Sequence, residues 1–160
     1  PAAGTDPGSI NLATAGAIVA TSNVDAMTLS AAPPPVINPS TLVTYTAGNL
    51  PEFIPGSGVY LSTMFLSVNP NPFGFDLAGI LTNTPGCNAW IVTLDLDLGA
   101  QLTFVPTATW NFTYNNTYFA PGNAIAAQAI GLFDSAFPLV NGESGGFLFS
   151  NGVLSTTQTQ

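Results

Sequence analysis

The sequence predicts an all-β fold, an antiparallel β-sandwich of roughly 8–10 strands with an extended N-terminal strand segment. β-Branched and aromatic residues are abundant, Lys and Arg are absent, and Gly, Pro and Asn recur between the apolar runs. The chain has 160 residues, 46% of them hydrophobic, which is enough for one domain to bury a core.

Composition divides the chain into three parts. Residues 1–30 are rich in Ala, Thr, Ser and Gly, and we expect an N-terminal strand segment there. Residues 31–40 are Pro-rich, which predicts an extended connector. Residues 41–160 carry the clear strand patterns and form the predicted β-sandwich domain.

Two runs predict strands in the first half of this domain. Residues 59–68 are strongly apolar and end at an Asn-Pro-Asn-Pro sequence. In residues 89–98 the even-numbered positions, from Trp90 to Leu98, are large and apolar, while the positions between them become polar. This alternation predicts a strand whose even-numbered face lies in the core.

Two further runs, 101–105 and 107–114, follow after Gly99 and Pro106. Because consecutive strands with short connections usually lie side by side, we expect these runs to form a β-meander with the strand before them. The last run places its aromatic side chains on one face: Trp110, Phe112 and Tyr114.

Three runs follow in the last part of the chain. Residues 124–133 are Ala-rich, yet the sequence IGLF at their end favours a strand over a helix. Residues 147–150 and 153–155 flank Asn151-Gly152, a pair typical of a two-residue hairpin turn. We therefore expect a hairpin there.

The charge composition excludes several classes of function. Eight Asp and Glu residues and no Lys, Arg or His give a net charge of −8. Nucleic acid is a poor partner because its phosphates bind through cationic side chains. Membrane insertion is not expected, since no run approaches ~20 consecutive apolar residues. Without a His or Lys base, we expect no enzyme and no cofactor.

We expect no catalytic or metal site, and Asp95 and Asp97 are only weak candidates for one. They lie two apart on a predicted strand, so both carboxylates project from one face. Such a pair could serve Ca²⁺ or half of a glycosidase site. The other acids are scattered, so a solvated strand face that discourages edge pairing is the favoured interpretation.

Two other patterns have a structural and a functional interpretation. The sequence GESGG at 142–146 resembles the surroundings of a serine protease nucleophile, but no base is present to activate Ser144, which favours a glycine-rich turn. The aromatic face of residues 107–114 could stack on a carbohydrate, although such a face is more often core.

The N-terminal segment carries the main functional hypothesis. Small apolar side chains occur on both faces of residues 9–21, as in a strand that is buried on both sides. The segment could complete the sheet of a neighbouring subunit by strand addition, or form the first strand of its own subunit. The candidate interface residues are Ile10, Leu12, Ile18 and Val19.

Three features bear on location. The chain begins at Pro1, which fits a mature end after signal-peptide removal. Asn111 and Asn115 begin glycosylation-type sequons, although a Thr-rich chain produces these by chance. Cys87 is alone, so it is buried, free, or paired with another chain. We expect an extracellular or cell-surface protein.

Residues 70–154 carry short motifs whose order and spacing resemble a β-domain of large secreted or cell-surface proteins of bacteria such as planctomycetes. The motifs are Asp76-Leu77-Ala78-Gly79, Pro85-Gly86-Cys87, Pro121-Gly122, Ala127-Gln128-Ala129 with Phe133-Asp134, and Ser150-Asn151-Gly152-Val153-Leu154. The resemblance implies an exported β-sandwich without catalytic residues.

These observations together predict an extracellular structural protein. We expect a subunit of a self-assembling filament, pilus-like fibre or surface layer, whose partners are copies of itself. A weakly charged surface favours such association. The alternative is a secreted carbohydrate-binding β-sandwich module.

Overall fold

The structure is a computed structural model that describes residues 9–11, 27–32, 41–77, 79–81, 88–114, 124–137, 139 and 143–156. Within these residues the chain forms twelve strands and no helix, and every strand pair is antiparallel. The predicted antiparallel all-β fold is confirmed, with more strands than the roughly 8–10 that turn spacing suggested.

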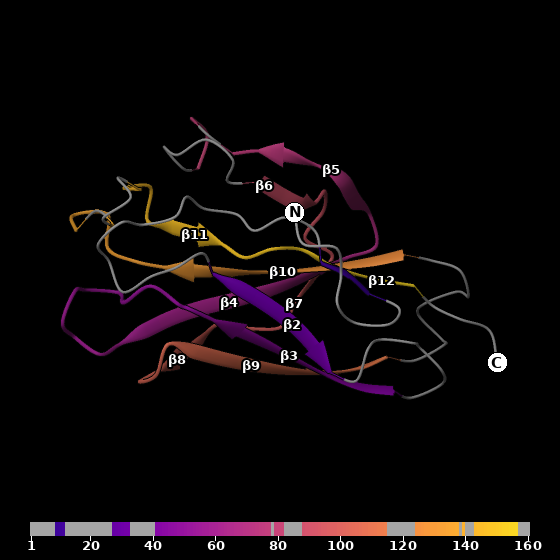
Figure 1. The fold of residues 1–160 in the computed structure, drawn as a ribbon, viewed down its shortest axis with the longest axis horizontal. Helices are drawn as coiled ribbons and strands as arrows, with labels where there is room; N and C mark the ends of the chain where they lie inside the picture. Colours follow the sequence, from indigo (N-terminus) through magenta and orange to yellow (C-terminus); the bar gives the residue numbers. More distant parts are fainter. Residues whose placement is uncertain are drawn as a thin grey trace.

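The larger sheet has seven strands (Figure 1). Its main path runs β1-β12-β10-β4-β7, while β11 also pairs with β10 and β8 also pairs with β4. Its strands are β1 (Ser9–Asn11), β4 (Tyr60–Ser67), β7 (Leu96–Asp97), β8 (Gln101–Thr103), β10 (Ala124–Leu132), β11 (Phe147–Phe149) and β12 (Val153–Thr156).

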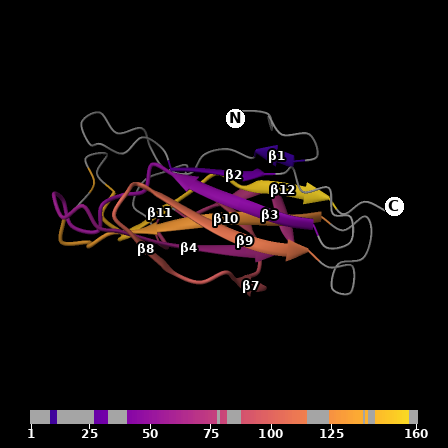
Figure 2. The ribbon, with the colours of Figure 1, turned by 90° about the horizontal axis from the view of Figure 1, so that it is seen from below.

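A three-stranded sheet lies against the larger one (Figure 2), and a two-stranded sheet lies beside β10 of the larger sheet (Figure 1). The three-stranded sheet has the order β2-β3-β9, with β2 (Thr28–Ala32), β3 (Thr41–Gly48) and β9 (Thr107–Tyr114). The two-stranded sheet pairs β5 (Pro70–Asp76) with β6 (Asn88–Ile91).

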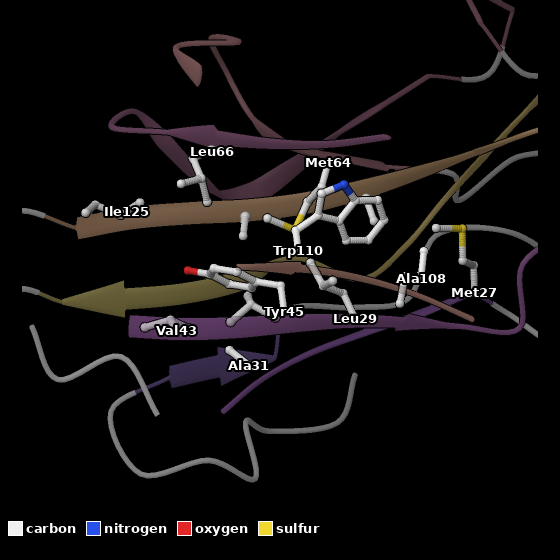
Figure 3. Close-up of a cluster of buried hydrophobic side chains, with 14 of the residues drawn as sticks. Met27, Leu29, Ala31, Val43, Tyr45, Met64, Leu66, Ala108, Trp110 and Ile125 are labelled. Atoms are coloured by element: carbon white, nitrogen blue, oxygen red, sulfur yellow. The ribbon is translucent and has the colours of Figure 1, made fainter. Parts of the chain in front are cut away.

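The core lies between the larger and the three-stranded sheet (Figure 3). Strand β9 alternates between exposed Thr or Asn side chains and buried or half-buried apolar ones, as its sequence predicts. Leu66 from β4 and Ile125 from β10 meet this layer from the opposite sheet. The two sheets therefore form a sandwich.

Residues 27–32 contribute to the same core. Met27 and Leu29 are buried, and β2 pairs along its whole length with β3. These residues come from the stretches that composition assigned to the N-terminal segment and the Pro-rich connector.

The predicted strand at 89–98 is wrong in its length and its buried face. The chain forms β6, leaves strand geometry, and resumes as β7. Trp90 is buried, but Val92 and Leu94 are 64% and 63% exposed. The alternation is present in the sequence, yet the described residues leave Val92 and Leu94 mostly uncovered.

The predicted β-meander is also wrong. Strands β7 and β8 both pair with β4, whereas β9 pairs with β3 in the other sheet. The chain therefore crosses between the two layers after β8 (Figure 2).

The predicted hairpin around Asn151-Gly152 does not form, because β11 and β12 both pair with β10. They lie end to end along it, with Ile130 opposite Phe149 and Ala127 opposite Val153. Residues 150–152 thus oppose only residues 128–129, which makes the Asn-Gly pair part of a bulge.

Candidate functional site

Asp95 and Asp97 each bind local donors. The Asp95 Oδ2 accepts hydrogen bonds from the Thr93 hydroxyl at 2.6 Å and the Val68 amide at 2.8 Å. These two hydrogen bonds, that from Thr93 first, hold the pKa of Asp95 below its usual value. The Asp97 Oδ1 accepts from the Gly99 amide at 2.8 Å and the Thr63 hydroxyl at 2.9 Å. Both carboxylates therefore stabilise the irregular edge around β7.

The described residues contain no group of three or more His, Cys, Asp or Glu side chains that could hold a metal ion. Within that part of the chain, no helix is long and apolar enough to cross a membrane.

The aromatic face of β9 lies in the core. Trp110 is 2% exposed, and its Nε1 donates to the Gly99 carbonyl at 2.9 Å. The ring of Phe112 meets that of Tyr114 edge-on, with centroids 4.7 Å apart. The carbohydrate platform suggested for these residues is wrong, because Trp110 is not accessible to a sugar ring.

Tyr114 forms a buried hydroxyl pair with Tyr45 of β3. Burial, followed by the neighbouring Tyr45 hydroxyl, raises the pKa of Tyr114 well above its usual range. The two hydroxyls form a hydrogen bond with each other inside the core, so this pair has a structural role.

The GESGG segment leads into β11. Glu143 is buried, its Oε1 accepts from the Gly145 amide at 2.8 Å, and its carbonyl accepts from the Leu139 amide at 2.8 Å. Gly146 has a φ of 84°, which a side chain rarely adopts. This geometry agrees with the expected glycine-rich turn.

The N-terminal candidates are only partly placed. Ile10 lies in β1 opposite Leu154 of β12 in the same chain, with Ser9 opposite Ser155 and Asn11 opposite Val153. Leu12, Ile18, Val19, Asn115 and Cys87 lie outside the described residues.

Asn111 lies on the exposed face of β9. There its side-chain oxygen accepts a hydrogen bond from the Thr44 hydroxyl at 2.7 Å. Among the predicted site residues that the structure describes, only Asp95 and Asp97 lie close together, and they flank the start of β7.

Sequence reasoning missed a buried polar cluster beside the β10 bulge. Gln128 is 1% exposed; its Oε1 accepts from the Trp90 amide at 3.0 Å, and its Nε2 donates to the Asn88 and Ser150 carbonyls at 2.8 and 2.9 Å. The sequence signal was a single Gln within an apolar strand. A side-chain amide buried at such a position needs hydrogen-bond partners, which indicates a polar cluster.

An apolar hollow of about 340 Å³ opens at the side of the sandwich between β4 and β9. Its wall includes Phe112, together with Val68 and Leu96, which are 44% and 37% exposed. The lining residues are Leu66, Ser67, Val68, Asp95, Leu96, Phe112 and Ile125. The hollow can take an apolar group.

No protein family, curated protein or solved structure matches the chain. The similarity to β-domains of bacterial surface proteins therefore stays a prediction.

Proposed function

We propose that the chain is an extracellular structural subunit that assembles with copies of itself into a filament, with its N-terminal strand exchanged between neighbours. The observation that carries this proposal is the pairing of β1. This three-residue strand sits at the edge of the larger sheet and pairs there with β12.

Exchange of β1 would preserve every pairing contact. The three residue pairs from Ser9–Ser155 to Asn11–Val153 are the same whether β1 comes from its own chain or from a neighbour. Swapping an identical element between copies is a low-cost route to assembly, and head-to-tail repetition produces a filament. The residues that connect β1 with β2 include Leu12, Ile18 and Val19, which we propose to contact the neighbour.

The composition supports a role as an exterior material. Cohesion must come from apolar burial and backbone hydrogen bonds, because the chain contains no Lys, Arg or His. The same absence removes the sites at which trypsin-like proteases cut, which suits a protein exposed outside the cell.

Disulfide trapping tests the exchange. In a Cys87→Ser background, Ile10→Cys and Leu154→Cys place two thiols directly opposite each other, where the Cβ atoms of antiparallel partners are about 5 Å apart. We expect oxidation of the assembled protein to give a ladder of covalent oligomers on a non-reducing gel, and filaments by negative-stain microscopy.

The matched control joins Thr44→Cys to Asn111→Cys, whose parent side chains meet across β3 and β9 of one chain. This pair should give only an internally linked monomer. If the Ile10–Leu154 pair also gives only monomers while filaments are present, strand exchange is wrong. If concentrated protein stays monomeric by sedimentation and microscopy, self-assembly itself is wrong.

A further inference from the structure

The end of β8 and its connection to β9 expose three large apolar side chains within four residues. Leu102, Phe104 and Val105 are 57%, 75% and 56% exposed, and we call them the apolar knob. The Thr103 hydroxyl donates to the Val105 carbonyl at 2.8 Å, and the Pro106 carbonyl accepts from the Leu50 amide at 3.1 Å. These hydrogen bonds fix the backbone of the knob. Its clustered exposed apolar side chains are typical of a contact site.

The apolar hollow has the size and the chemistry to accept such a side chain. An apolar cavity of about 150 Å³ accommodates benzene, and the hollow measures about 340 Å³. Its two polar lining residues are occupied locally: the Ser67 hydroxyl contacts Thr93 at 3.0 Å, and Asp95 accepts from Thr93 and Val68. The other described lining residues are aliphatic or aromatic: Leu66, Val68, Leu96, Phe112 and Ile125.

The knob and the hollow of one chain cannot meet. Phe104 precedes β9 and Phe112 lies near its other end, so at about 3.3 Å per strand residue the two sites are about 25 Å apart. In Figure 1 the β8–β9 connection lies at the left of the sandwich, and β9 runs from it toward the right. The knob can enter a hollow only in a second copy.

We propose that the apolar knob of one copy inserts into the apolar hollow of the next. The inference rests on the proposed self-assembly and adds a contact separate from β1 exchange. Asp95 lines the hollow, and no copy of the chain has a cationic side chain to pair with it, so a second copy can fill the hollow only with an uncharged group such as the knob. Because the two surfaces differ, the contact is heterologous and repeats along a filament.

This contact limits the filament geometry. Each knob sits in the hollow of the previous copy, so successive knobs are separated by about the knob-to-hollow distance within one chain. The axial rise per subunit therefore cannot exceed about 25 Å, the distance that β9 spans between the two sites. Helical reconstruction from electron cryomicroscopy measures this rise.

Two substitutions test the knob itself. Phe104→Ser should raise the concentration needed for assembly at least about tenfold, as expected when an aromatic anchor is removed from a contact. Phe73→Ser is the matched control, because Phe73 is 92% exposed on β5 and belongs neither to the knob nor to the described lining of the hollow. Pelleting assays give the critical concentration, and circular dichroism checks that both variants fold.

Mixed disulfide trapping tests the pairing of the two sites. In Cys87→Ser chains, a Val105→Cys copy should cross-link to a Val68→Cys copy. It should not cross-link to an Ile54→Cys copy, although Ile54 and Val68 have similar exposure, 39% and 44%.

The outcomes separate this inference from the proposed function. If the wild-type chain never assembles, the proposed function fails. If it assembles, but Phe104→Ser behaves like Phe73→Ser or Val105→Cys links equally to both partners, only the knob-and-hollow contact is overturned.

Discussion

Asn151 holds Leu29 through both polar atoms of its side chain. Its Oδ1 accepts from the Leu29 amide at 2.7 Å, and its Nδ2 donates to the Leu29 carbonyl at 3.0 Å. Leu29 lies in the three-stranded sheet, whereas Asn151 lies in the bulge between β11 and β12 of the larger sheet. A single side-chain amide thus performs the pairing that a strand backbone would otherwise supply, and it joins the two layers of the sandwich.

Asp95 should titrate below the ordinary aspartate pKa. The hydrogen bonds from Thr93 and Val68 favour its charged form, so the pKa of Asp95 lies below 3.8. Because the pKa of Asp95 is lower in the folded than in the unfolded state, its ionisation stabilises the fold at pH values above the unfolded-state pKa. This contribution is lost as the pH falls through the folded-state pKa. Carbon NMR titration of the carboxyl group gives the midpoint directly.

Thr93→Val removes the hydroxyl donor and should shift the Asp95 midpoint upward, toward 3.8. Thr113→Val, on the exposed face of β9, is the control and should leave the midpoint unchanged. A wild-type midpoint at or above 3.8 would contradict the assignment of these hydrogen bonds.

At the scale of the element, Gln128 ties the two-stranded sheet to the larger one. It contacts the backbone of Trp90 and Asn88 in β6 and of Ser150 beside β11. Gln128→Met keeps the side-chain length but leaves these buried backbone groups without a partner, which should cost about 3 kcal/mol of unfolding free energy. Urea denaturation measures this loss.

The same variant should expose the Trp90 amide to hydrogen exchange while the β3–β9 amides stay protected. Gln101→Met is the matched control, because Gln101 is only half-buried and its side-chain Nε2 donates to a single backbone group, the Thr109 carbonyl, at 2.5 Å. Gln101→Met should lower the unfolding free energy by less than about 1 kcal/mol. Equal losses for the two variants would show that Gln128 does not join the sheets.

Strands with one face in the core were predictable from the sequence. The runs at 59–68, 107–114 and 124–133 correspond within two residues to β4, β9 and β10. Their periodicity records burial, which is a property of the strand itself. The periodicity of a strand does not indicate which strand it pairs with. The sequence therefore wrongly predicts a meander that includes β7, β8 and β9.

The Asn-Gly pair shows how a local signal can serve another purpose. Gly152 does not have the positive φ that a type I′ turn requires. A Cβ there would lie 2.6 Å from the Cβ of Trp90, so Gly152 permits close packing instead. Its neighbour Asn151 points at Leu29, 122 positions away in sequence. Neither constraint is visible in the residues that flank the pair.

The candidate contact sites were equally hidden from sequence reasoning. The apolar hollow takes side chains from β4, β7, β9 and β10, which only the fold brings together. Asp95 and Asp97 were singled out by their spacing, yet their hydrogen bonds show that they stabilise the β7 edge.

For the whole molecule, a charge of −8 without any cationic side chain predicts the salt response of assembly. Copies repel one another at low salt, and no ion pair between side chains exists for salt to weaken. Raising NaCl from about 10 to about 300 mM shortens the Debye length from about 30 Å to well below 10 Å. We expect the critical concentration to fall over this range.

Light scattering at a series of salt concentrations measures this response. Sucrose at matched refractive index serves as the control for optical effects. An increase in critical concentration with NaCl would contradict assembly through apolar and backbone contacts.

The Asn151 link has a consequence for the chemical ageing of the protein. Asn-Gly sequences in flexible chains deamidate when the glycine nitrogen attacks the side-chain carbonyl, but here Leu29 holds that carbonyl in a buried place. Conversion to aspartate would replace the donor to the Leu29 carbonyl with an anion, and the chain has no cationic side chain to neutralise it. Deamidation of Asn151 should therefore proceed only from states in which the two layers have separated, and the aspartate that it produces should weaken the link between them.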